Sequence, residues 1–261
     1  MNCNFSGEVY IFSVKGVFFL RMSLTKINSL IEKEQYYHHY QPLFNLTNGD
    51  RIGYEVLFRS SLFENPEIPF RIARKINQLY ELETKSIHKA ISSFSAAQYV
   101  TKDAKLFINV FPSTITNPTF LTFMNKTLTE TQLKSQQIIF EVNETEFVPN
   151  IVSFKNSLSD LKKQGFLIAI DDVGRGSASL RAIIELEPNY VKMDRYFSVD
   201  LSISINKQEM IKSIITYCKN TNVHFILEGI ESSIDLEVAK LLGVSYGQGY
   251  ILGRPSPLIS K

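Results

Sequence analysis

Residues 167–172 read Leu-Ile-Ala-Ile-Asp-Asp, an unbroken apolar run that ends on two neighbouring carboxylates. A strand that buries one face alternates apolar and polar residues, whereas a parallel strand covered on both faces is apolar throughout. The run from Phe225 to Leu227, which Glu228 follows, repeats the pattern. The sequence therefore predicts a parallel sheet covered on both faces, with acidic side chains where its strands end.

Eight β-rich runs recur along the chain, and stretches of helical periodicity separate most of them. We expect strands at 37–46, 52–58, 105–110, 137–142, 166–170, 190–193, 223–227 and 249–252. We expect helices at 24–34, 71–94, 118–133, 150–163, 179–185, 208–221 and 234–242. This alternation is typical of the α/β class, and eight strands fit a TIM-like (β/α)8 barrel better than a doubly wound sheet. Asn48-Gly49-Asp50 is a hairpin signal that predicts an antiparallel first pair.

Composition and charge exclude several classes of function. The 261 residues are 44% hydrophobic and 21% charged, which indicates a globular chain, and no linker or internal repeat points to a second domain. Lys and Arg total 28 against 26 for Asp and Glu, a balance that disfavours a DNA or RNA partner. No uncharged apolar stretch reaches about 18 residues, so no membrane span is expected. GxGxxG and GxxxxGK[ST] nucleotide-binding loops do not occur.

The chain has two cysteines, Cys3 and Cys218, which cannot staple a fold of this size, and it has no Cys/His cluster for zinc. We therefore expect a cytoplasmic protein with reduced thiols. Residues 1–22 form an N-terminal extension of unknown role, which we interpret as an edge strand, a hairpin or a leader before an alternative start at Met22, rather than as a membrane anchor. The barrel domain is expected at 23–261, with Ser23 as the N-cap of its first helix.

Polar residues close the apolar runs at their downstream ends, which meet at one face of a barrel. They are Asn109, Glu141, Asp171, Asp172, Lys192 and Glu228, with Glu55 inside the second run. Each acid alone can be a solvated strand end or a helix cap. Several carboxylates in one mouth repel one another unless cations lie between them, and hard oxygen ligands suit Mg²⁺ or Mn²⁺ rather than Zn²⁺.

Short motifs follow one another in a fixed order over residues 24–257. They are Tyr40-Gln41-Pro42-Leu43, Gly53-Tyr54-Glu55-Val56-Leu57-Phe58-Arg59, Asn109, Glu141-Val142-Asn143-Glu144, Asp171-Asp172-Val173-Gly174-Arg175-Gly176, Val191-Lys192-Met193-Asp194-Arg195, Glu228-Gly229-Ile230-Glu231 and Gly247-Gln248-Gly249-Tyr250. This ordered set resembles the signature of the EAL-domain cyclic-di-GMP phosphodiesterases. The resemblance implies a TIM-like barrel whose first strand is antiparallel, and hydrolysis of cyclic-di-GMP to linear pGpG by water activated at two cations, Mg²⁺ or Mn²⁺. It also implies a bacterial host and leaves a homodimer open.

The resemblance assigns a role to each matching residue. The metal-binding set is Glu55, Asn109, Glu141, Asp171, Asp172 and Glu228. The catalytic set is Lys192 and Gln248 at the attacking water, Glu144 holding the loop after Asp172, and Glu231 as a supporting acid. The substrate contacts are Gln41, Leu57, Arg59 at a phosphate and Asp194 at a guanine edge. No histidine is needed, and we interpret His38, His39, His88 and His224 as packing or surface residues.

Some positions depart from the family pattern. Val56 replaces a usual Ala and should be tolerated, whereas Arg74 and Asn77 stand where the family commonly has Glu and Gly. Val173 and Arg175 replace a usual Phe and Thr in the loop after Asp172. The smaller Val173 predicts a more mobile loop and a lower turnover, which Val173→Phe should raise.

Those departures leave two readings of the function open. The retained Glu55, Lys192 and Glu228 favour an active phosphodiesterase. The altered loop and pocket favour a catalytically silent cyclic-di-GMP receptor or a protein-interaction module on the same barrel.

Overall fold

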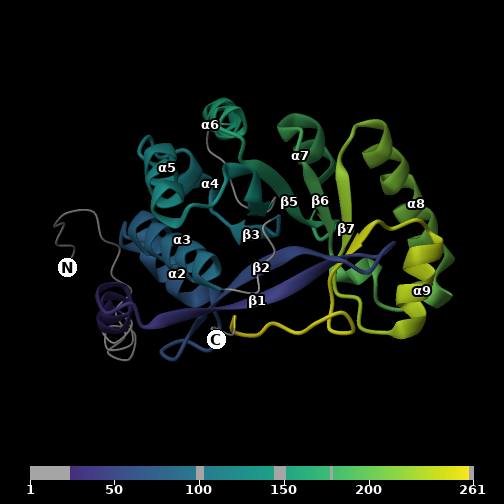
Figure 1. Ribbon diagram of the computed structural model, residues 1–261, viewed down its shortest axis with the longest axis horizontal. Helices are drawn as coiled ribbons and strands as arrows, with labels where there is room; N and C mark the ends of the chain where they lie inside the picture. Colours follow the sequence, from purple (N-terminus) through teal and green to yellow (C-terminus); the bar gives the residue numbers. More distant parts are fainter. Residues whose placement is uncertain (1–23, 98–102, 144–150, 177–178, 259–261) are drawn as a thin grey trace, which may run out of the picture.

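The computed structural model describes residues 24–97, 103–143, 151–176 and 179–258 (Figure 1). Its strands form a closed barrel in sequence order, β1 to β8. They are β1 Tyr36–Asn45, β2 Arg51–Ser60, β3 Lys105–Asn109, β4 Ile138–Asn143, β5 Leu167–Val173, β6 Tyr190–Met193, β7 His224–Leu227 and β8 Tyr246–Gly247. From β2 to β8 every neighbouring pair is parallel, whereas β1 is antiparallel to both β2 and β8. The predicted barrel with an antiparallel first strand is confirmed.

Helices surround the outside of the strands (Figure 1). After a first helix over residues 24–32, they are α2 Glu67–Lys75, α3 Leu79–Ala96, α4 Pro112–Ile115, α5 Phe120–Thr131, α6 Ile151–Lys163, α7 Ser179–Leu186, α8 Ile205–Asn220 and α9 Ser233–Leu241. Short 3₁₀ turns lie at η1 Ser135–Gln137, η2 Arg195–Phe197 and η3 Leu201–Ile203. Among the helices of the described ranges, none has the length and apolarity that a bilayer crossing requires.

The long β1–β2 hairpin opens the barrel. Gly49 takes a φ of 77°, a conformation that favours glycine, and the Asp50 amide donates to Asn48 Oδ1 at 3.0 Å. The register places Gln41 beside Glu55. The hairpin that Asn48-Gly49-Asp50 predicts is therefore confirmed, and it brings two predicted site residues together.

Two expected elements differ from the structure. The helix expected over 71–94 is divided into α2 and α3, because Asn77 between them has a φ of 58°. Asn tolerates this left-handed conformation better than other residues with a Cβ, and it stands where the family commonly has Gly. The helical spacing of apolar residues continues from α2 into α3, so the sequence predicts a single helix there.

The strand expected over 249–252 is wrong. The last strand is Tyr246–Gly247, and the chain then turns, with the amides of Leu252 and Gly253 both bonded to the Gly249 carbonyl at 3.0 and 2.9 Å. Gly249 lies so close to the backbone of Ile230 that a Cβ would be 2.0 Å from its carbonyl oxygen. This close approach explains the glycine better than a strand does.

The barrel interior is filled in layers, since side chains two positions apart point to the same face of a strand. The inner apolar layer contains Leu43, Phe107, Ile139, Ala169, Tyr190 and Ile226. The next inward positions toward the carboxyl ends of the parallel strands are Asn109, Glu141, Asp171, Lys192 and Glu228. The apolar layer thus closes the floor beneath a polar mouth.

Residues 1–23 lie outside the described ranges, so the domain bounds stay a prediction.

Candidate metal centre at the mouth of the barrel

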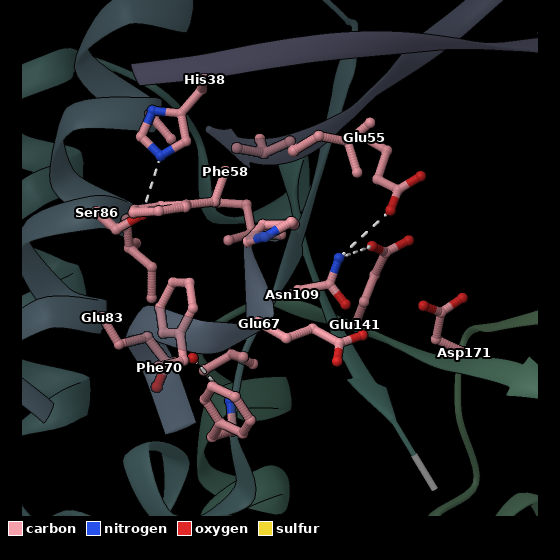
Figure 2. A pocket seen from close by; sticks show the side chains of 18 of the residues that line it. His38, Glu55, Phe58, Glu67, Phe70, Glu83, Ser86, Asn109, Glu141 and Asp171 are labelled. Atoms are coloured by element: carbon pink, nitrogen blue, oxygen red, sulfur yellow. Dashed lines mark hydrogen bonds between the residues drawn. The ribbon is translucent and has the colours of Figure 1, made fainter. Parts of the chain in front are cut away.

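A cavity of about 730 Å³ opens at this mouth and extends toward α2 and α3 (Figure 2). One end is acidic, with Glu55, Glu141 and Asp171 in its wall. Aromatic rings line the middle, and Phe58 and Phe70 lie 4.9 Å apart between ring centroids. The cavity therefore joins an acidic end to a chamber lined by both aromatic and polar side chains, a common design of small-molecule sites.

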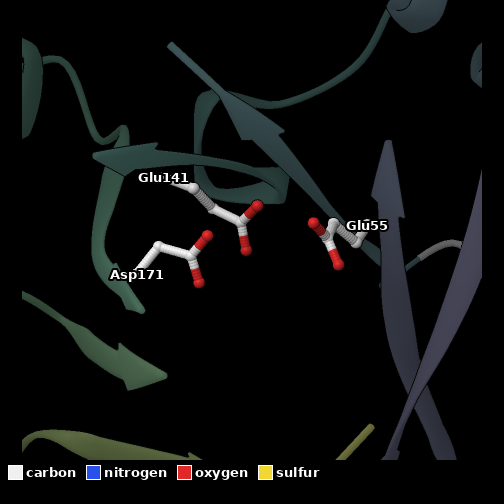
Figure 3. A group of neighbouring side chains, drawn as sticks. All are labelled: Glu55, Glu141 and Asp171. Carbon is white, nitrogen blue, oxygen red and sulfur yellow. The ribbon is translucent and has the colours of Figure 1, made fainter. Parts of the chain in front are cut away.

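Three carboxylates converge at the acidic end (Figure 3). Glu55, Glu141 and Asp171 come from β2, β4 and β5, and each offers one oxygen so that all three atoms lie within 4.8 Å of one another. Glu141 is fully buried. Such a group of hard oxygen atoms has the chemistry of a divalent cation site.

Lys192 is the cation within this group. Its Nζ lies 2.6 Å from Glu141 Oε1, 2.7 Å from Glu228 Oε1, 3.1 Å from Asp171 Oδ1 and 3.7 Å from Glu55 Oε2. Burial alone would lower the pKa of Lys192, but the four carboxylates outweigh that effect and hold the pKa well above its ordinary value. Lys192 is therefore a permanent buried charge.

One ammonium does not balance four carboxylates. Burial raises the pKa of both Glu141 and Glu228 well above the usual range, although Lys192 opposes the shift. Glu141 Oε1 and Asp171 Oδ1 both meet the Lys192 ammonium, at 2.6 and 3.1 Å, and no other hydrogen-bond donor reaches them among the described residues. Several carboxylates that share a single ammonium fit the Mg²⁺ or Mn²⁺ that the sequence predicts.

Two amide side chains hold the carboxylates in place. Asn109 Nδ2 donates to Glu55 Oε1 at 3.3 Å and to Glu141 Oε2 at 3.1 Å (Figure 2). Gln248, one residue past β8, donates from Nε2 to Glu55 Oε2 at 2.5 Å. The structure thus gathers Glu55, Asn109, Glu141, Asp171 and Glu228 of the predicted metal set with Lys192 and Gln248 of the catalytic set.

Asp172 lines the same cavity, but its carboxylate is paired with a different cation. It interrupts the β5–β6 register with a φ of 56°, and its Oδ2 lies 3.1 Å from Arg175 Nη1. Within the described residues it does not join the group formed by Glu55, Glu141 and Asp171.

Of the predicted substrate contacts, some line the cavity and others do not. Leu57 and Arg59 line the cavity, and Arg59 Nη1 donates to the carbonyl of Phe58 at 2.8 Å. Gln41 is buried beside Glu55 and donates to the Gly253 carbonyl at 3.1 Å.

Among the described residues, two further predicted residues, Asp194 and Glu231, lie away from the cavity wall. Asp194 accepts from the Tyr196 amide at 2.8 Å as the cap of η2, and Glu231 is paired with Arg195 at 3.2 Å. Glu144 lies outside the described residues.

Several polar residues of the cavity were not among the predicted site residues, and two of them, His38 and Glu83, are buried and titratable. His38 is buried and shares a 2.9 Å hydrogen bond between Nε2 and Ser86 Oγ (Figure 2). Burial lowers the pKa of His38 to about 3, so the ring is neutral near pH 7. Glu83 accepts from the Phe111 amide at 2.8 Å, and burial raises the pKa of its carboxyl to about 8.

The sequence carries a weak signal for both residues. His38 alternates with buried Tyr36 and Tyr40 along β1, and Glu83 lies four positions from Leu79 and from Ile87 on the apolar face of α3. Each is a polar residue at a position that the periodicity of its strand or helix assigns to the buried face, and no sequence motif includes it.

The EAL domain model matches residues 25–255 of the chain. Curated relatives include the cyclic di-GMP phosphodiesterase PdeB of Shewanella oneidensis, 28% identical over 90% of this chain, and RocR of Pseudomonas aeruginosa, 26% identical over 87%. The chain spans only 28% of PdeB and 59% of RocR.

Solved structures of similar fold include the PaMucR phosphodiesterase in complex with c-di-GMP, with a TM-score of 0.80 and 24% identity over 90% of this chain and 98% of that one. Another is the manganese and cyclic-di-GMP complex of BlrP1 from Klebsiella pneumoniae, with a TM-score of 0.78 and 24% identity over 85% of this chain and 56% of that one. At this identity the likeness concerns the fold.

Proposed function

The chain belongs to the EAL domain family, and we propose from this that it is a phosphodiesterase that hydrolyses cyclic-di-GMP to linear pGpG with Mg²⁺ or Mn²⁺. The observation that supports it is the convergence of Glu55, Glu141 and Asp171, each with one carboxylate oxygen within 4.8 Å of the others, beside the single buried ammonium of Lys192.

Each residue of the mouth has a part in the proposed reaction. Divalent cations bound there would lower the pKa of a water molecule and neutralise the phosphodiester. Glu55, Asn109, Glu141, Asp171, Asp172 and Glu228 would hold them. Lys192 and Gln248, which both contact Glu55 Oε2, would orient the attacking water.

The remaining predicted residues would bind substrate or support the site. Arg59, at the cavity wall with Leu57, would bind a phosphate by charge-assisted hydrogen bonds, and Gln41, paired in register with Glu55, would contact the substrate from β1. Asp194 would meet a guanine edge. Glu144 would hold the loop after Asp172. Glu231 would support the site through its ion pair with Arg195.

One observation favours the second reading, a catalytically silent receptor or protein-interaction module. The carboxylate of Asp172 is paired with Arg175 instead of joining the acidic cluster. A site with an incomplete ligand set would bind the dinucleotide without cleaving it.

The two readings are separated by one experiment. Purified protein is incubated with cyclic-di-GMP and Mn²⁺ or Mg²⁺, and the products are resolved by chromatography, with a chelator and Glu55→Gln as controls. We expect pGpG only in the metal-loaded wild type. Binding of cyclic-di-GMP without any product would instead favour the silent receptor, and neither binding nor product would contradict both.

A further inference from the structure

Arg175 forms a closed turn with Asp172. The Arg175 amide donates to the Asp172 carbonyl at 3.0 Å, and the guanidinium Nη1 lies 3.1 Å from Asp172 Oδ2. The backbone and the side chain of Arg175 therefore both fold back on the same residue. The guanidinium of Arg175 therefore holds one oxygen of the Asp172 carboxylate within the turn.

Steric packing fixes the shape of this turn. Gly174 has a φ of 95°, and a Cβ at that position would lie 2.4 Å from the ring of Phe197. Asp172 itself has a φ of 56°, which is uncommon for a residue with a Cβ. The ring of Phe197 and the left-handed residues hold the loop so that Arg175 faces Asp172.

The neighbouring carboxylates have a different cation. Glu55, Glu141, Asp171 and Glu228 all lie within 3.7 Å of Lys192 Nζ. Two adjacent residues of β5, Asp171 and Asp172, are therefore paired with two different cations. This division separates one compact ligand group from a single carboxylate outside it.

We propose that Arg175 holds the carboxylate of Asp172 away from the acidic cluster, so that the chain binds one divalent cation tightly and a second cation weakly. The inference rests on the proposed function, which supplies the metal site. A second cation must compete with a guanidinium that stays charged at any working pH. Arg175 is thus a positioning residue that limits completion of the site.

The size of the effect follows from exposure. The side chain of Arg175 is 65% exposed and that of Asp172 is 20% exposed, so solvent screens their attraction. Asp194 and Glu67 also attract Arg175 and give its guanidinium other partners when it leaves Asp172. We therefore expect removal of Arg175 to tighten the second binding step by about fivefold.

The test is a titration of the metal-free full chain with Mn²⁺ alone. Calorimetry measures the heat of each binding step, and the electron paramagnetic resonance signal of free Mn²⁺ measures how much Mn²⁺ stays unbound. The variants are Arg175→Ala and Arg175→Lys, with Arg181→Ala as the matched control, since Arg181 is an exposed arginine of α7. We expect two binding steps in the wild type. Arg175→Ala should tighten the second step alone, Arg175→Lys should do so less, and Arg181→Ala should change neither.

A double-mutant cycle identifies Asp172 as the partner. In an Asp172→Asn background, Arg175→Ala should no longer change the second step. An unchanged second step in Arg175→Ala, or an equal change in Arg181→Ala, would overturn the inference. Hydrolysis of cyclic-di-GMP by the same proteins would show that the proposed function still holds. Absence of any Mn²⁺ binding in every protein would overturn the metal site, and with it both this inference and the proposed function.

Discussion

Glu55 connects most of the site, because Asn109, Lys192 and Gln248 all contact its carboxylate. These contacts serve a charge cluster rather than an apolar core. Removal of one acid from a cluster with excess negative charge relieves repulsion in the metal-free protein. Its side chain is therefore expected to matter more for metal binding than for folding.

We expect Glu55→Ala to lower the kcat of cyclic-di-GMP hydrolysis by about 1000-fold, because a ligand of the proposed cation is lost. Thermal unfolding of the metal-free variant should occur at the wild-type temperature or above it. Glu237→Ala, which removes an exposed acid of α9, is the control and should change neither quantity. Near-normal turnover by folded Glu55→Ala would refute the metal assignment.

Glu83 gives a pH dependence of stability that can be measured. Its pKa is raised from 4.5 to about 8 by burial, so the folded protein keeps a proton that the unfolded chain releases above about pH 4.5. The folded state then binds more protons than the unfolded state, and the free energy of unfolding falls as pH rises from 4.5 toward 8. The loss is on the order of 4 kcal/mol.

Glu83→Gln should remove this dependence while its amide oxygen still accepts from the Phe111 amide. Urea unfolding near pH 5 and near pH 8 measures the difference between the two proteins. Glu81→Gln, an exposed position on the same helix, should keep the wild-type slope. The raised pKa would be refuted by equal slopes in the wild type and Glu83→Gln.

The β5 strand shows how packing changes an expectation drawn from residue size. Val173 in place of an aromatic residue predicts a loosely packed loop, yet Val173 is only 2% exposed and belongs to the main core. The ring of Phe197 lies against the neighbouring Gly174. Aromatic packing beside this loop thus comes from η2, which a comparison by sequence position does not reveal.

We therefore expect Val173→Phe to overpack the core and to lower the free energy of unfolding by about 1–3 kcal/mol, without raising turnover. Urea unfolding and Mn²⁺-dependent hydrolysis measure the two effects, and Val173→Ile, which adds one methylene, should cause a smaller loss. Higher turnover in Val173→Phe at unchanged stability would restore the expectation of a loose loop.

For the molecule as a whole, the periodicity of apolar residues predicts the elements whose position depends on local burial, which are the buried strands of the barrel. Apolar runs such as Leu167 to Ile170 locate buried strands, and the polar residue after each run locates the mouth. β8 has two residues and is held by pairing with β1 and β7, so its short sequence carries no strand pattern of its own. The Asp172–Arg175 pair depends on a left-handed residue, which residue type alone does not specify.

Barrel closure brings the charges of distant strands together, so the stability of the whole fold should depend on what neutralises the mouth. Lys192 is that neutralising group in the described residues, with four carboxylates within 3.7 Å of its Nζ. Its removal leaves buried carboxylates without a counter-ion, a change that typically costs about 3–5 kcal/mol. A bound cation would supply the missing positive charge.

We expect Lys192→Met to lower the free energy of unfolding of the metal-free protein by about 3 kcal/mol, and Mn²⁺ to restore more stability in this variant than in the wild type. At a Mn²⁺ concentration of about 100 times Kd, binding adds about 2.7 kcal/mol. Turnover should fall far more than affinity for cyclic-di-GMP, because the proposed role of Lys192 is at the attacking water. Thermal unfolding with and without Mn²⁺ measures the stability, and steady-state kinetics measure turnover and affinity. If Lys192→Met has wild-type stability and responds to Mn²⁺ no more than the wild type does, another group neutralises the mouth.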